Sequence, residues 1–169
     1  DVQKFCSKLA LQGASATLPT EAEWEFACRA GSTTPFSFGA NISTRQANYD
    51  GNYPYADGEV GEFREQTVSV RALPANAWGL YQMHGNVWEW CVDTMRQYSA
   101  EEVTNPSLAQ VFANEQSEDL RLLRGGGWIG GAMDVSAASR FGTQPDRQGN
   151  FIGFRFVLRP SKANQASRV

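Results

Sequence analysis

The side chains best suited to chemistry in this chain are one histidine, His84, and the three cysteines Cys6, Cys28 and Cys91. A zinc or iron site with several histidine ligands is excluded within these residues, and any Ser/His/Asp triad would have to include His84. No Gly-x-Ser-x-Gly turn accompanies the histidine. We therefore interpret His84 as a hydrogen-bonded structural residue of the turn that leads to Asn86.

The cysteines are odd in number, widely spaced and without a Cys-x-x-Cys pair. This pattern argues against a disulfide framework and against a thiolate zinc site. We expect three buried, unpaired thiols, which favour a reducing compartment for a soluble protein.

A metal site built from oxygen ligands is more promising than one built from histidine or cysteine. The turn at residues 85–89 places backbone carbonyls next to a carboxylate, an oxygen-rich set that Ca²⁺ accepts. The glycines of residues 124–127 superficially resemble a phosphate-binding loop, but no Lys-Ser/Thr follows them. Close backbone packing under Trp128 explains these glycines better.

Length and charge limit the possible functions. The 169 residues fit one domain, which would bury roughly 70% of the surface of its unfolded chain. A net charge of −3 without a Lys/Arg run offers no attraction for nucleic acid or anionic lipid. No apolar run approaches the ~20 residues of a membrane span, and no signal-peptide pattern opens the chain. Because the chain lacks an initiating Met, we expect its N-terminal part to be missing, so the compartment stays open.

Two helices are predicted near the start of the chain. Apolar residues at helical spacing predict a helix over residues 1–12, with Gly13 as its left-handed stop. Thr20 and Glu23 form a capping box that begins a second helix, and Gly31 ends it.

The rest of the chain is predicted to be mostly ordered loop with short strands. Residues 32–75 turn repeatedly and contain one β-prone piece at 67–70, whereas residues 95–121 are a polar surface excursion. Strands are predicted at residues 122–123 and 154–158, before a polar tail over 161–169. We expect the five tryptophans to lie mostly in the core: Trp24, Trp78, Trp88, Trp90 and Trp128.

Four sequence blocks carry a family resemblance: LPTEAEWEFA at 18–27, GLYQMHGNVWEWC at 79–91, RGGGW at 124–128 and GFR at 153–155. With them, residues 1–160 resemble the formylglycine-generating enzyme, or sulfatase-modifying factor, family. The resemblance implies an α+β, C-type-lectin-like fold with two helices, short antiparallel strands and extensive ordered loops. Residues 1–160 would be one such domain lacking its N-terminal part, followed by the tail.

The resemblance also implies metal sites. The family binds calcium at two loop sites, whose matching positions here are Asn48 and Tyr49 for one, and Gln82, Gly85, Val87 and Glu89 for the other. Its copper chemistry uses two cysteines and a serine, but the matching positions are Gly130, Val135 and Gly127. From the two loop sites we expect structural calcium. Because Cu(I) is held by soft thiolates, we expect no copper and no catalytic residues of this kind.

Three functions remain open. The first is a non-catalytic binding module that presents its C-terminal loops to a protein or small molecule, as in the variable proteins of diversity-generating retroelements. Its candidate ligand-binding residues are Trp128, Ile129, Gly131, Asp134, Phe141 and Gln144. The alternative is a cysteine-independent, metal-dependent oxidoreductase of the same family, acting in protein or metabolite maturation, with ligands from the missing segment or a fused domain. The third, a regulatory domain attached to another enzyme, rests on fold analogy alone.

Overall fold

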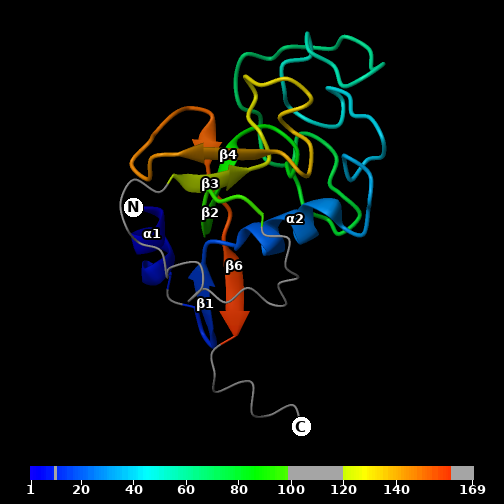
Figure 1. Cartoon of the computed structure of the whole chain (residues 1–169). Helices are drawn as coiled ribbons and strands as arrows, with labels where there is room; N and C mark the ends of the chain where they lie inside the picture. Colours follow the sequence, from blue (N-terminus) through cyan, green and yellow to red (C-terminus); the bar gives the residue numbers. More distant parts are fainter. Residues whose placement is uncertain (10, 99–119, 161–169) are drawn as a thin grey trace.

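The computed structural model describes residues 1–9, 11–98 and 120–160. Its elements, in chain order, are α1 (Val2–Lys8), β1 (Ala14–Thr17), α2 (Glu21–Arg29), β2 (Trp88–Thr94), β3 (Arg121–Arg124), β4 (Arg140–Thr143), β5 (Ile152–Gly153) and β6 (Val157–Pro160). The predicted α+β class and the two helices are confirmed. Between α2 and β2 the chain forms a lobe of ordered loops beside the sheet (Figure 1). In the described part of the chain, no helix is long and apolar enough to cross a membrane.

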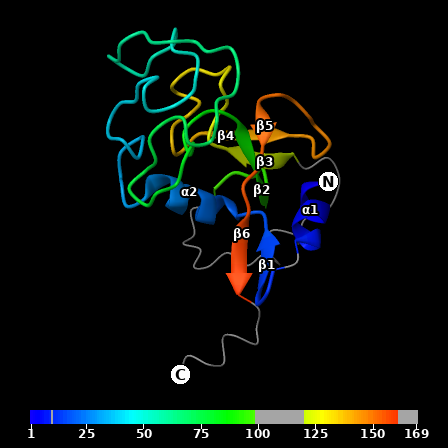
Figure 2. The ribbon, with the colours of Figure 1, turned by 180° about the vertical axis from the view of Figure 1, so that it is seen from behind.

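The strands form two sheets (Figure 2). The larger has the order β4-β3-β2-β5, and β1 pairs with β6 in a separate two-stranded sheet. Three of the pairings are antiparallel, but β2 and β5 run parallel, with Trp88 opposite Ile152. The prediction of antiparallel strands was therefore wrong for β5. A parallel pair arises because a long connection separates β2 from β5 in the sequence.

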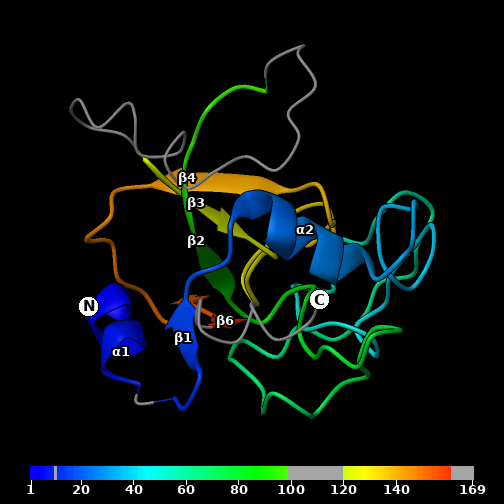
Figure 3. The ribbon, with the colours of Figure 1, turned by 90° about the horizontal axis from the view of Figure 1, so that it is seen from below.

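Helix α2 begins and ends as its sequence predicts. The Thr20 hydroxyl accepts from the Glu23 N–H at 3.2 Å, and a Glu23 carboxylate oxygen accepts from the Thr20 N–H at 2.8 Å. Ala30 takes the left-handed conformation at the end of the helix, one residue before Gly31. The helix packs against β2 and β3 (Figure 3), so its buried face fixes the strand pair on which the later loops stand.

Three predicted elements differ in the structure. The first helix ends at Lys8, because Leu9 is already extended, and Gly13 turns the chain into β1 instead of stopping the helix. Residues 67–70 form no strand, since the Val68 N–H and carbonyl bond to the side chain of Asn86. The strand predicted at 154–158 begins only at Val157, as β6, and residues 154–156 separate it from the short β5. The predicted tail and most of the polar excursion lie outside the described residues.

The core consists of two clusters. One gathers Trp24, Cys28, Met83, Cys91, Leu122 and Ala137, and the other gathers Phe36, Ile42, Ala47, Tyr49, Ala132 and Val135. Trp24 and Trp88 are buried and Trp90 and Trp128 are half-buried. The prediction that Trp78 belongs to the core was wrong, because 49% of this residue is exposed and its ring lies against Phe26 on the surface.

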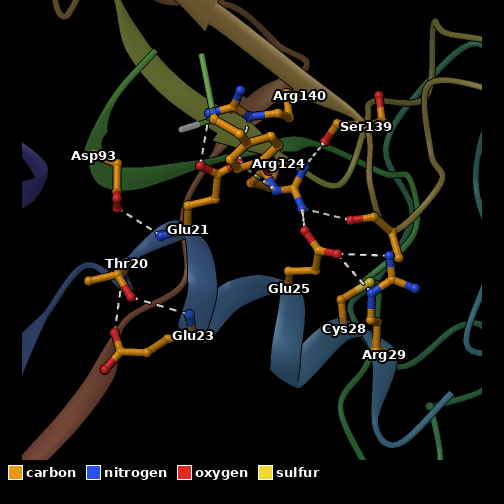
Figure 4. Close-up of polar contacts among 12 residues, drawn as sticks. Thr20, Glu21, Glu23, Glu25, Cys28, Arg29, Asp93, Arg124, Ser139 and Arg140 are labelled. Atoms are coloured by element: carbon orange, nitrogen blue, oxygen red, sulfur yellow. Dashed lines mark hydrogen bonds and ion pairs between the residues drawn. The ribbon is translucent and has the colours of Figure 1, made fainter. Parts of the chain in front are cut away.

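A buried arginine ties α2 to the C-terminal loops (Figure 4). Arg124 is fully buried at the end of β3, where its guanidinium pairs with Glu25 and donates to the carbonyls of Ala137 and Ser139. Arg140, at the start of β4, pairs with both carboxylate oxygens of Glu21 at 2.6 and 2.9 Å. These pairs fix the backbone on both sides of the junction between the C-terminal turn and β4.

Candidate ligand-binding site

Three loops meet at residues 85–86, and backbone hydrogen bonds join them. The Gly85 N–H donates to the Gly125 carbonyl at 2.7 Å, and the Asn86 N–H donates to the Asn48 carbonyl at 2.8 Å. The Asn86 carbonyl in turn accepts from the Trp128 N–H at 3.0 Å. The turn before β2 therefore fixes both the loop at residue 48 and the loop at residues 125–128.

This meeting of loops depends on Gly85. Its φ is +82°, and a Cβ at this position would lie 2.3 Å from the Asn48 carbonyl oxygen. Only a residue without a side chain allows such an approach. The neighbouring Asn86 is also left-handed, with φ of +70°, and its side-chain oxygen accepts from the Asn48 amide at 3.0 Å and from the Val68 N–H at 2.9 Å.

The predicted structural role of His84 is confirmed. Its Nδ1 lies 2.7 Å from the Val135 carbonyl oxygen and therefore carries the proton, while its Nε2 accepts from the Ser37 N–H at 3.0 Å. Burial lowers the pKa of His84, which keeps the ring neutral. The bond to Val135 makes this histidine a support for the C-terminal turn.

No thiolate forms beside this histidine. The Cys28 sulfur is 3.6 Å from His84 Nε2, but burial raises the pKa of Cys28 to about 12. Burial likewise raises the pKa of Cys91 well above its ordinary value. Cys6, Cys28 and Cys91 are all buried and unpaired, as predicted. Buried thiols with a raised pKa, here Cys28 and Cys91, are inert toward metals and electrophiles.

The turn of residues 125–135 has a buried side and an exposed side. Val135 is fully buried against the second core cluster, and Gly127 lies close to Phe151 and Trp88. Ile129 is 44% exposed and Met133 is 68% exposed. The turn thus presents apolar side chains outward from a backbone that the core holds in place.

The structure brings together four of the predicted ligand-binding residues. Trp128, Ile129, Gly131 and Asp134 share the turn, in which Asp134 is exposed and accepts from the Gly131 N–H at 3.1 Å. Trp128 is held from both sides, because its ring stacks on Phe63 with centroids 6.1 Å apart and its indole N–H donates to the Asn150 carbonyl.

The other two predicted residues lie at β4. Phe141 is 39% exposed and its ring is 5.3 Å from that of Trp88, which in turn lies beside Gly127. Phe141 therefore reaches the turn through the Trp88 ring. Gln144 is exposed in the loop that follows β4.

Sequence reasoning missed Tyr53 as part of this surface. Tyr53 is 67% exposed, its carbonyl accepts from the Ala132 N–H at 2.9 Å, and its Cβ lies next to Gly131. Met133 was missed as well. The aromatic-rich segment around residue 53 indicated ordered loop, but no local signal showed that it packs on residues 130–132.

Comparison with known proteins shows which family this architecture belongs to. The sulfatase-modifying factor enzyme 1-like domain matches residues 1–160. The chain belongs to the formylglycine-generating enzyme family. It is 33% identical over 151 residues to the formylglycine-generating enzyme of Bos taurus, a match that covers 84% of this chain and 38% of the relative. It is 34% identical to the inactive C-alpha-formylglycine-generating enzyme 2 of Bos taurus, over 82% of this chain and 42% of the relative.

A solved structure extends the comparison. Treponema denticola variable protein 1 superposes with a TM-score of 0.67 and 30% identity, covering 86% of this chain and 48% of that protein. The predicted C-type-lectin-like fold of the formylglycine-generating-enzyme type is thereby confirmed. The chain spans about two fifths of the length of the two bovine relatives.

The first calcium site expected from the family resemblance falls on Asn48 and Tyr49, and both residues are fully buried. The Tyr49 hydroxyl donates to the Ile42 carbonyl at 3.1 Å. The Asn48 amide nitrogen donates to the Gln66 carbonyl and to Asn86, whereas the Asn48 Oδ1 is buried without a hydrogen-bond partner. An oxygen of this kind fits a cation.

The second set, Gln82, Gly85, Val87 and Glu89, fits a cation less well. The Glu89 carboxylate accepts from the Trp24 indole N–H at 2.8 Å and pairs through both oxygens with Arg155. Its charge is already balanced by the guanidinium, and a calcium ion there would be repelled by Arg155. Among the described residues, no group of three or more His, Cys, Asp and Glu side chains could hold a metal.

The contact at Gly85 yields a stability prediction with a matched control. Gly85→Ala should lower the free energy of unfolding by about 3–5 kcal/mol, because the new Cβ would overlap the Asn48 carbonyl as well as strain the backbone. Gly79 also has a positive φ, +78°, but no atom lies within 4 Å of a Cβ there. Gly79→Ala should therefore cost only about 1–2 kcal/mol. Urea denaturation of both variants measures the difference, and equal losses would show that the three loops do not meet as described.

Proposed function

We propose that this chain is a non-catalytic ligand-binding domain that displays its C-terminal loops on the scaffold of the formylglycine-generating enzyme family. The observation that carries the proposal is the turn of residues 125–135. Its backbone is fixed by the core, by His84 and by the Asn86 carbonyl, while Ile129, Met133 and Asp134 face solvent. A fixed backbone with exposed, replaceable side chains is the arrangement that recognition loops require.

The chemistry of sulfur supports a role in binding. The positions that would carry the family's cysteine pair hold Gly130 and Val135. The described thiols are buried, and burial suppresses ionisation of Cys28 and Cys91. Neither Cys28 nor Cys91 therefore supplies the soft, deprotonated ligand that Cu(I) and thiol exchange need.

The relatives support the same reading. One bovine relative bears the name of an inactive formylglycine-generating enzyme, and the structural neighbour from Treponema denticola is named a variable protein. We therefore extend the proposal to diversified binding, in which replaceable side chains of the loops after Arg124 define the ligand. The ligand-contacting set remains Trp128, Ile129, Gly131, Asp134, Phe141 and Gln144.

Diversification makes a prediction about the native gene. A near-copy of the DNA that encodes residues 128–152 should lie near the gene, together with a reverse-transcriptase gene, and should differ mainly at adenines. The differing codons should be those of exposed residues such as Ile129, Asp134 and Gln144, because Ala132 and Val135 are fully buried and their replacement would disturb the core. Sequencing of the native locus tests this. A locus with neither the copy nor the reverse transcriptase would contradict diversified binding.

We also propose that a structural calcium ion binds at the junction of loops near Asn48. The support is the buried Asn48 Oδ1, which lacks a partner inside a polar junction. When bound, calcium would supply the charge that satisfies this oxygen, and Asn48, Tyr49 and neighbouring backbone carbonyls would hold it. The ion would stabilise the base on which the C-terminal turn stands.

Calcium binding is testable by thermal melting. Removal of calcium with a chelator should lower the melting temperature by about 5 °C, and calcium, but not magnesium, should restore it. Glu89→Gln serves as the discriminating variant. Loss of the Arg155 pair should lower its melting temperature in either condition, yet the calcium-dependent difference should persist. A melting temperature unaffected by chelator in the wild-type protein would contradict calcium binding, and a difference lost only in Glu89→Gln would move the ion to the second set.

A further inference from the structure

We infer that the partner of the proposed binding surface is a basic polypeptide segment that places a bulky apolar side chain against Tyr53, Ile129 and Met133. The inference rests on the proposed function and adds the chemical class of the ligand. It follows from how two loops, residues 50–65 and residues 127–139, share one surface and from the charge that they carry. We call the exposed side of these two loops the acidic face.

The two loops contact each other through residues 128–132 of the second loop. The Asp50 N–H donates to the Gly130 carbonyl at 2.8 Å, and the Ala132 N–H donates to the Tyr53 carbonyl at 2.9 Å. The stacked rings of Phe63 and Trp128 join them at a second place. Figure 1 shows the yellow segment of the C-terminal turn lying against the loops of the lobe. The acidic face is therefore a continuous, supported part of the structure.

Large apolar side chains of the acidic face are open to solvent. Tyr53 is 67% exposed, Met133 is 68% exposed and Ile129 is 44% exposed, and Val60 adds a further exposed aliphatic group at 70%. The backbones of residues 53 and 129–133 are held by the bonds described above, so little ordering is needed before they make contact. Exposed apolar groups on a rigid base are typical of the centre of a protein interface.

Charge decides which partner fits. The two loops contain six carboxylates, Asp50, Asp57, Glu59, Glu62, Glu65 and Asp134, and one arginine, Arg64. Their net charge of −5 exceeds the −3 of the whole chain, so all the other residues together are positive by two. The two loops thus carry an excess of negative charge, although Asp50 is buried, whereas the rest of the chain is net positive.

The single arginine does not change this balance. Arg64 donates to the Thr44 carbonyl at 2.8 Å and pairs with Glu62 at 2.9 Å, and its own side chain is mostly buried. Asp57, Glu59, Glu65 and Asp134 remain exposed. Exposed carboxylates on the same two loops as the exposed apolar side chains attract lysine- and arginine-bearing segments and repel acidic ones. An aliphatic or aromatic residue of the partner would then cover Tyr53, Ile129 and Met133.

The test is a selection of peptides by the whole protein. A phage-displayed library of random dodecapeptides is panned against the immobilised chain, and the enriched peptides are synthesised and measured by fluorescence anisotropy. We expect the enriched sequences to be net positive with at least one bulky apolar residue. Their dissociation constants should rise about fivefold or more between about 50 and 300 mM NaCl, because salt screens exposed charges.

Variants assign the binding to the acidic face. Tyr53→Ser combined with Met133→Ser should weaken binding about tenfold or more, and Asp134→Asn about threefold. Leu158→Ser is the matched control, because Leu158 is 56% exposed on β6, outside both loops, and its replacement should leave affinity unchanged. Thermal melting of each variant confirms that it is folded.

The outcomes separate this inference from the proposed function. Neutral or acidic peptides whose binding is lost in Tyr53→Ser/Met133→Ser would overturn the charge argument and leave the binding function intact. Basic peptides that bind this double variant as tightly as the wild type would overturn the inference and also remove support for binding at the C-terminal turn. A selection that enriches no basic peptide at all would overturn the inference.

Discussion

The structure depends on the close backbone approach at Gly85. Three loops that are far apart in the sequence exchange hydrogen bonds within two residues, and one of the contacts leaves no room for a side chain. Local propensity cannot hold such loops, because the segment between α2 and β2 contains no helix or strand of its own. Backbone hydrogen bonds to Asn48, Gly125 and Trp128 therefore hold these loops together, as the hydrogen bonds between strands hold a sheet. The backbone geometry of the C-terminal turn, and any function that depends on it, is therefore set by this junction.

A second layer of support lies beneath the turn. The buried Arg124 guanidinium satisfies the Ala137 and Ser139 carbonyls and is balanced by Glu25 on α2. A buried charge of this kind is costly unless it is paired and hydrogen-bonded, and removal of one partner would leave the other uncompensated. With His84 bonded to Val135, both ends of the turn are fixed by polar contacts that do not involve its exposed side chains. Those side chains are consequently free to differ without loss of the fold.

Much of this could be predicted from the sequence where the signal is local. The capping box at Thr20 and Glu23, the structural role of His84 and the unpaired cysteines all follow from residue type and spacing, and each is confirmed. The family resemblance predicted the fold, which the comparison with known proteins also confirms. The failures concern non-local contacts. A tryptophan such as Trp78 is predicted to be core from its residue type alone, whereas its neighbours leave it half exposed. The sequence of β1 carries no strand pattern, and this segment is a strand because it pairs with β6. Tyr53 joined the candidate surface only because two distant loops are bonded together.

We propose that this scaffold has kept the family fold without the sulfur chemistry of the formylglycine-generating enzymes. Gly130 and Val135 stand where thiolates would be required, and Val135 is buried in the core. The most direct test is incubation of the purified protein with Cu(I), oxygen and a cysteine-containing sulfatase peptide, followed by mass spectrometry of the peptide. We predict that the cysteine is recovered without conversion to the aldehyde beyond a protein-free control. Accumulation of the formylglycine peptide in proportion to the protein would contradict the central claim.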